Sequence, residues 1–184
     1  MEVKSLQIED VKIIKPKKIL DDRGFFSETY NQEKFAESDI NINFVQDNHS
    51  LSMDKGVIRG LHFQIDPYAQ DKLVRVIQGS ILDVAVDLRQ GSSSYGKHVT
   101  AIISSEEWNQ ILVPVGFAHG FCTLEENTEV VYKVSNLYSP DHDKGLRWND
   151  PTLKIDWPVS ADQAILSEKD LQQPFFNELP IYFS

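Results

Sequence analysis

Short apolar runs, each closed by turn residues, recur along the chain and determine its predicted architecture. The runs are NFVQDNHSLS, GVIRGLHFQ, KLVRVIQGSILDVAVDLR, HVTAIIS, NQILVPVGFAHGF and EVVYKVSNLY. Within residues 81–88, four apolar residues alternate with a second set that includes Asp83 and Asp87, which is the period-two pattern of a strand with two unlike faces. Gly79 and Ser80 interrupt the longest run and predict a hairpin there. We interpret the runs as β-strands.

Helical signals are few and short. They cover residues 32–37, 105–108 and 167–171, and the last of these has Ser167 as a candidate N-cap. Many short strands with few helices favour an all-β protein, and we predict a double-stranded jelly-roll β-sandwich with a few short helices. No repeat, low-complexity tract or linker divides the 184 residues, so we expect a single domain over 1–184. The interior of such a sandwich can hold one small ligand.

Composition and charge narrow the classes of partner. The chain has 41% hydrophobic and 25% charged residues, and 18 basic against 28 acidic residues give a net charge of −10. A negative field argues against a nucleic-acid or anionic-membrane binder. We expect no membrane association and a cytoplasmic location, because no long apolar run and no signal peptide pattern is evident. The single cysteine, Cys122, is interpreted as a buried thiol without a redox role.

Two histidines lie in otherwise apolar strand-like runs, His62 in GVIRGLHFQ and His119 in VPVGFAHGF. An ionisable side chain in such a run needs a partner or a task, although a core histidine bonded to a carbonyl also fits. Local metal-ligand spacing is missing, since Phe63 and Gln64 follow His62 and no nearby Glu completes a set of ligands. A long-range set of His62, His119 and Asp83 stays open, but we expect no metal.

Nine segments, in the same order, resemble the dTDP-4-dehydrorhamnose 3,5-epimerase family. They are DDRGFFSETYNQEKF, FVQDNHSLS, GVIRGLHFQ, AQDKLVRVIQG, LDVAVDLR, VPVGFAHGF, YKVSNLYSP, LRWND and LSEKD, and they span nearly the whole chain. The resemblance implies a cupin-type jelly roll that works as a homodimer without a metal or organic cofactor. It also implies inversion of C3 and C5 of a dTDP-4-keto-6-deoxy sugar, in the synthesis of dTDP-L-rhamnose. The segment QIDPYAQDK departs from the family pattern but retains Lys72.

The resemblance assigns four catalytic residues. It implies that His62 is the base, that Asp170 fixes its tautomer, that Tyr132 is the proton donor, and that Lys72 stabilises an enolate at the C4 oxygen. These roles suit the residue types, because a free imidazole is mostly neutral at neutral pH and a phenol is protonated. Without the resemblance, Asp170 fits a surface helix terminus equally well, and Tyr132 fits a core tyrosine.

The resemblance also implies a set of substrate-binding residues. Arginine suits the diphosphate because its planar fork matches phosphate oxygens, and Tyr138 is expected to stack on thymine. The set comprises Arg23, Glu28, Gln46, Asp47, Asn48, Arg59, Lys72, His119, Tyr138, Asp143 and Lys169, and Asp83 is expected beside His119.

The spacing of Arg59 and His62 conflicts with simple strand alternation. An odd separation sends the two side chains to opposite faces, whereas both are expected at one site. Gly60 offers a solution, because glycine often marks a bulge. We predict either a bulge there or an Arg59 side chain that reaches in from the rim.

Two other functions remain open at this point. An enzyme that inverts only C3 or only C5 of a related dTDP-keto-sugar would need the same catalytic residues. A non-catalytic sugar-nucleotide-binding jelly roll would need the arginines and aromatic residues but neither base nor acid. The joint presence of His62, Asp170, Tyr132 and Lys72 favours an enzyme.

Overall fold

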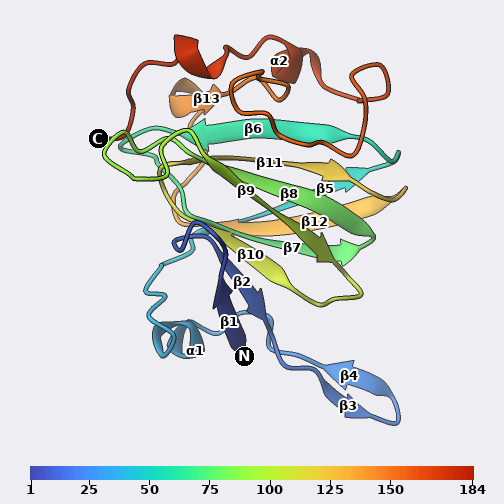
Figure 1. The fold of residues 1–184 in the computed structure, drawn as a ribbon. Coiled ribbons are helices and arrows are strands. Elements are labelled where there is room, and N and C mark those ends of the chain that lie inside the picture. The colour runs from blue at the N-terminus through green and yellow to red at the C-terminus, as the bar shows by residue number, and fades with distance from the viewer.

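The computed structural model describes residues 1–184 and has two antiparallel sheets packed face to face (Figure 1). The six-stranded sheet has the order β1 (Glu2–Ser5), β2 (Lys12–Lys15), β10 (Gln110–Val113), β7 (Lys72–Gln78), β12 (Thr128–Val134) and β5 (Gln46–Ser52). The five-stranded sheet has the order β13 (Asp143–Gly145), β6 (Ile58–Gln64), β11 (Phe117–Thr123), β8 (Ser80–Asp87) and β9 (His98–Ser104). The prediction of an all-β jelly roll is confirmed.

Helices are short, as predicted. Helix α1 covers Gln32–Ala36 and helix α2 covers Glu168–Leu171, with 3-10 turns at Pro140–His142 and Phe176–Glu178. Ser167 is the N-cap of α2, and its side chain accepts a hydrogen bond from the Asp170 backbone N–H. No helix is long and apolar enough to cross a membrane.

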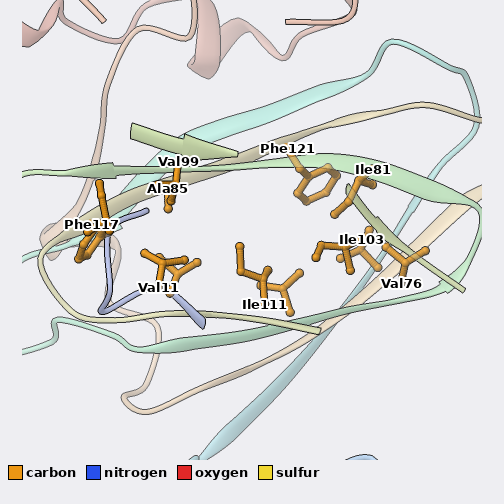
Figure 2. Packing of buried hydrophobic residues seen from close by; sticks show 13 residues of the cluster. Val11, Val76, Ile81, Ala85, Val99, Ile103, Ile111, Phe117 and Phe121 are labelled. Carbon is orange, nitrogen blue, oxygen red and sulfur yellow. The ribbon is translucent and has the colours of Figure 1, made fainter. Parts of the chain in front are cut away.

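The main core fills the space between the two sheets (Figure 2). Ile81 and Ala85 of β8 point into it and pack against Val76 of β7 and Ile111 of β10. Asp83 lies on the same face of β8, so its carboxylate is carried into the interior. The alternation in residues 81–88 predicts a strand face that carries carboxylates, and in the structure this face is buried between the sheets.

The other face of the five-stranded sheet is buried too. Val84, Val86 and Leu88 form a second core cluster with Leu61 and Phe63 of β6, covered by Leu153 and Phe183. The covering residues belong to the C-terminal segment, drawn orange to red above β6 and β13 (Figure 1). Because this segment packs on β6, it brings α2 close to the side chains of that strand.

Two local predictions are wrong. Gly79 and Ser80 do not form a hairpin, because β7 belongs to the six-stranded sheet and β8 to the five-stranded one. Gly79 has φ +80°, and a Cβ there would lie 2.5 Å from Thr128 Oγ1, so the chain turns a tight corner between sheets. Residues 105–108 form a turn rather than a helix, in which Ser104 Oγ accepts from the Glu107 N–H at 3.0 Å.

A two-stranded hairpin projects from the body of the sandwich. It consists of β3 (Ile19–Asp21) and β4 (Gly24–Phe26) and lies beyond the edge of both sheets (Figure 1). Its apolar side chains are largely exposed, with Leu20 at 76% and Phe26 at 63%. Trp108 contacts the hairpin at its base, where its ring packs edge-on against Phe25 and its indole N–H donates to Ser27 Oγ at 3.1 Å. The body of the protein thus carries an apolar arm.

Candidate active site

A cavity of about 480 Å³ lies between the sheets and gathers side chains from several strands. His62 of β6, Lys72 of β7, His119 of β11 and Tyr132 of β12 line it, together with Asp170 of α2. A second cavity of about 130 Å³ shares His62, Lys72 and Tyr132 with the first. The three residues expected to act as base, cation and acid therefore stand where the two cavities meet, on strands that the sheets hold rigidly.

His62 is paired with a buried carboxylate. Its Nε2 lies 2.5 Å from Oδ1 of Asp170, and Asp170 is only 3% exposed. Burial by itself raises the pKa of Asp170, but the hydrogen bonds from His62 and Ser167 lower it further than burial raises it, so the pKa lies below its ordinary value. An ionised acceptor at Nε2 keeps the proton there, and Nδ1 makes no hydrogen bond to the protein. The imidazole thus presents a free basic nitrogen.

A bulge in β6 resolves the spacing of Arg59 and His62. His119 of β11 pairs with His62, whereas Phe121 pairs with Arg59, so two residues of β6 between these pairs oppose one of β11. Gly60 has φ +119° at the bulge, and the peptide bond between Gly60 and Leu61 is cis. Both Arg59 and His62 consequently line the same cavity. Of the two predicted alternatives, a bulge at Gly60 or an Arg59 side chain that reaches in from the rim, the structure shows the bulge.

Arg59 is held against β5 at the wall of the cavity. Its Nε donates to Ser52 Oγ at 3.1 Å, and its Nη2 donates to the Leu51 carbonyl at 3.0 Å. No carboxylate of the protein lies within salt-bridge distance of Arg59. A guanidinium whose charge is not neutralised by the protein can bind an anion.

The Lys72 side chain is bonded to the backbone of β6, the strand that carries His62. Its ammonium donates to the His62 carbonyl at 3.1 Å. Burial lowers the pKa of Lys72 to about 8, against the opposing effect of the negative charges on Asp143 and Asp83. The ammonium is therefore still mostly charged at neutral pH.

Tyr132 faces both cavities from the six-stranded sheet, opposite the strand that carries His62. Burial raises the pKa of its phenol, although the charge of Arg59 opposes that effect. The hydroxyl therefore keeps its proton throughout the neutral range. Tyr132 and His62 thus face the cavity from different sheets.

His119 forms a second histidine–carboxylate pair. Its Nε2 lies 2.8 Å from Oδ2 of Asp83, and both side chains are buried. Oδ1 of Asp83 is buried without a hydrogen-bond partner. His62 and His119 are thus each bonded to a separate aspartate, and no group of three or more His, Cys, Asp or Glu side chains is arranged to hold a metal ion.

Several of the residues expected to bind the nucleotide surround the smaller cavity. Gln46, Asn48, Tyr138 and Asp143 line it, and Lys169 forms an ion pair with Asp143 at its edge. The Tyr138 ring is 55% exposed, and its hydroxyl donates to Asp143 Oδ2 at 3.2 Å. An exposed ring fixed at its hydroxyl end is suited to stacking on a planar base.

Three of the expected binding residues lie elsewhere in this chain. The Asp47 side chain is on the opposite face of β5 and accepts from Lys133 Nζ at 2.9 Å. Arg23, on the turn of the β3–β4 hairpin, pairs with Asp21 and is 89% exposed in its side chain. Glu28 forms an ion pair with Lys34 near α1. None of the three lines either cavity.

One residue beside the His62–Asp170 pair was not expected in the site. Ser167 lines the larger cavity, and its hydroxyl donates to Oδ2 of Asp170 at 2.9 Å. The sequence identifies Ser167 as a helix cap only. A serine three residues before an aspartate is a common capping pattern, so only the position of His62 reveals the connection with the site.

The cavity of this jelly-roll sandwich is lined by a histidine–aspartate pair, a lysine and a tyrosine. These are the groups that an isomerase acting by proton transfer needs. The dTDP-4-dehydrorhamnose 3,5-epimerase family model matches residues 5–178. A dTDP-4-dehydrorhamnose 3,5-epimerase of Sinorhizobium fredii is 50% identical over 183 residues, which cover 100% of this chain and 93% of the relative. The chain belongs to the dTDP-4-dehydrorhamnose 3,5-epimerase family.

Solved structures agree with this assignment. The Bacillus anthracis dTDP-4-dehydrorhamnose 3,5-epimerase, with TDP and PPi bound, has a TM-score of 0.91 and 48% identity, over 95% of this chain and 98% of that one. A Legionella pneumophila dTDP-6-deoxy-D-glucose-3,5-epimerase in complex with dTDP-4-keto-L-rhamnose has a TM-score of 0.92 and 42% identity, over 97% and 94% of the two chains. The likeness covers both the fold and the sequence.

Proposed function

We propose that this chain inverts C3 and C5 of dTDP-4-keto-6-deoxyglucose and so produces the keto-sugar precursor of dTDP-L-rhamnose. The observation that carries the proposal is that His62, Lys72 and Tyr132 converge where two cavities meet. A non-catalytic binding domain would have no need for a base and an acid on opposite sheets around a buried cation.

The chemistry of the substrate explains why these groups are sufficient. C3 and C5 both flank the C4 ketone, which makes their C–H bonds acidic. Proton removal gives an enolate, and its negative charge develops on the C4 oxygen. Inversion then requires a base on one face of the sugar, an acid on the other, and a positive charge at that oxygen.

The four residues divide this work. Nδ1 of His62 removes the proton from the sugar carbon, and the Asp170 carboxylate at Nε2 stabilises the resulting imidazolium. The Lys72 ammonium stabilises the enolate, an effect that can contribute about 3–4 kcal/mol per donor in a site shielded from water. The Tyr132 hydroxyl delivers its proton to the opposite face. Solvent then reprotonates the phenolate and deprotonates the imidazolium before the second carbon reacts.

The proposal assigns the nucleotide to the polar wall around these groups. Arg59 is suited to the diphosphate because the protein provides no carboxylate for it, and Tyr138 is suited to the thymine because its ring is exposed. Gln46 and Asn48 face the smaller cavity and can bond hydroxyl or phosphate oxygens. His119 with Asp83 completes the polar side of the sugar site.

We also propose that the active form is a homodimer in which the hairpin of one chain reaches the site of the other. Arg23 and Glu28 are expected to bind substrate but lie on or after the β3–β4 hairpin, away from both cavities of their own chain. Exposed Leu20 and Phe26 give that hairpin an apolar surface, which marks a contact with another molecule. The cytoplasmic location expected from the sequence stays a prediction.

Deuterium exchange tests the reaction directly. The protein is incubated with dTDP-4-keto-6-deoxyglucose in D2O, and incorporation at each carbon is followed by NMR. Deuterium at both C3 and C5, with the L-sugar formed, is the expected result. Exchange at one carbon alone would identify a single-site epimerase, and tight dTDP binding without exchange would identify a binding protein.

Mixed dimers test the sharing of sites. His62→Ala and Arg23→Ala chains are each expected to be poorly active alone. Mixed and allowed to exchange subunits, they should regain activity, because some hybrid sites then combine an intact His62 with an intact Arg23. A mixture no more active than the sum of its parts would show that each chain uses its own hairpin or none.

A further inference from the structure

The Asp170 carboxylate is held by donors on both of its oxygens. Oδ1 is 2.5 Å from His62 Nε2, and Oδ2 accepts from the Ser167 hydroxyl at 2.9 Å. The same Ser167 oxygen accepts from the Asp170 backbone N–H at 3.2 Å. Ser167 therefore bonds Asp170 twice, once through the backbone and once through the group that contacts the base.

Helix α2 cannot orient Asp170 by itself. It has four residues, and a helix of one turn is unstable unless its surroundings hold it. Its C-terminal end is held by Arg147, whose guanidinium donates to the Leu171 carbonyl. Its N-terminal end is held by the Ser167 cap and by the ion pair of Lys169 with Asp143. The orientation of the carboxylate thus depends on side chains at the two ends of the helix.

We propose that Ser167 is a positioning residue that fixes the rotation of the Asp170 carboxylate and so orients the His62 imidazole. The inference rests on the proposed function of His62 as the base. Ser167 acts through Asp170 and not on the sugar, so its effect falls on proton transfer rather than on nucleotide binding.

The physical reason is that rotation about the Cβ–Cγ bond of an aspartate meets only a broad, shallow preference. The Ser167 hydroxyl occupies Oδ2 and leaves Oδ1 for His62. Without that hydroxyl, Oδ2 of Asp170 loses the one side-chain donor that the protein gives it, and a charged acceptor that loses its donor costs free energy. The carboxylate then turns to share one donor between two oxygens, and the imidazole turns with it.

The test compares Ser167→Ala with two other variants. Ser167→Thr keeps the hydroxyl and the capping ability. Ser160→Ala is the matched control, because Ser160 is exposed like Ser167 and also makes a hydrogen bond to a residue three positions on, to Gln163 Oε1 at 2.8 Å, but lines neither cavity. All three are assayed for kcat, for KM and for dTDP affinity. The proton NMR spectrum reports the downfield signal of the His62–Asp170 hydrogen bond without any turnover.

For Ser167→Ala we expect kcat to fall about 10- to 100-fold, as for the loss of a hydrogen bond to a charged group. KM and dTDP affinity should change less than about twofold, and the downfield signal should shift or broaden. Ser167→Thr should restore both the rate and the signal, and Ser160→Ala should match the wild type.

Three results would overturn the inference. They are an unchanged kcat in Ser167→Ala, an unchanged downfield signal, and a rate lost equally in Ser167→Thr. If the wild type itself shows no exchange in D2O, the proposed reaction fails instead. The NMR comparison then still decides whether Ser167 orients the pair.

Discussion

Gly60 of β6 and Gly120 of β11 lie in direct backbone contact across the bulge that brings Arg59 and His62 to one cavity. A Cβ on Gly60 would lie 2.7 Å from the Gly120 Cα and 2.7 Å from the His119 carbonyl oxygen. A Cβ on Gly120 would lie 2.7 Å from the Arg59 carbonyl oxygen. Both clashes are with backbone, which cannot move aside without shifting the two strands that carry the histidines.

Gly60→Ala should therefore destabilise the fold and damage the site together. The clash with backbone and the positive φ together suggest a loss of about 2–4 kcal/mol in the free energy of unfolding, measured by denaturant titration. Gly91→Ala is the control, because a Cβ there meets nothing within 4 Å. Equal stability of the two variants would show that the close approach is not needed.

The bulge also illustrates what the sequence alone can reveal. The odd spacing of Arg59 and His62, with a glycine between them, predicts an irregularity at the right place. Gly79 and Ser80 do not reveal which strands pair, because a sharp turn has similar local chemistry whether it joins two paired strands or crosses between sheets. In the structure β7 pairs with β10 and β12, and β8 pairs with β11 and β9. Strand alternation explains why Gln46 and Asn48 face the cavity while Asp47 does not.

The His62–Asp170 pair could not be derived from spacing. His62 and Asp170 are 108 positions apart, and only the packing of the C-terminal segment over β6 joins them. The family resemblance links the two, since it matches whole motifs. The β3–β4 hairpin and the short strand β13 escaped the sequence analysis, because three-residue strands carry too few positions for a periodic pattern.

His62→Ala should abolish deuterium exchange at both carbons while dTDP affinity stays within about threefold of the wild type. The imidazole lies where the two cavities meet, and its hydrogen bond is to Asp170. It makes no hydrogen bond to the residues that are expected to bind the diphosphate. Calorimetric titration with dTDP provides the measurement. His98→Asn on β9, which lines neither cavity, serves as the control. A large loss of dTDP binding would instead make His62 a ligand-binding residue.

Tyr132→Phe should separate proton removal from inversion. His62 still removes the proton, so deuterium enters the sugar, but it returns to the face from which the proton left. Formation of the L-sugar is expected to fall by about 10²- to 10⁴-fold, the usual contribution of a general acid, while some exchange with retained configuration persists. NMR of the recovered sugar distinguishes the two outcomes. Inversion at the wild-type rate would require another acid.

The alkaline limb of the pH profile should report Lys72. Burial lowers the pKa of this ammonium to about 8, and only its charged form stabilises the enolate. The value of kcat/KM, which follows groups of the free enzyme, should therefore be full below that pH and fall as pH rises through it. Tyr132 titrates later, because burial raises the pKa of its phenol.

Two variants assign this limb to Lys72. Lys72→Met should lower kcat by about 10²- to 10³-fold, as for the loss of one donor to a developing oxyanion, and should remove the limb. Lys72→Arg keeps a positive charge at every pH at which the protein is folded, so its profile should stay flat above pH 8 at a reduced rate. A limb that persists unchanged in Lys72→Arg would belong to another group, because arginine has no proton to lose in that range.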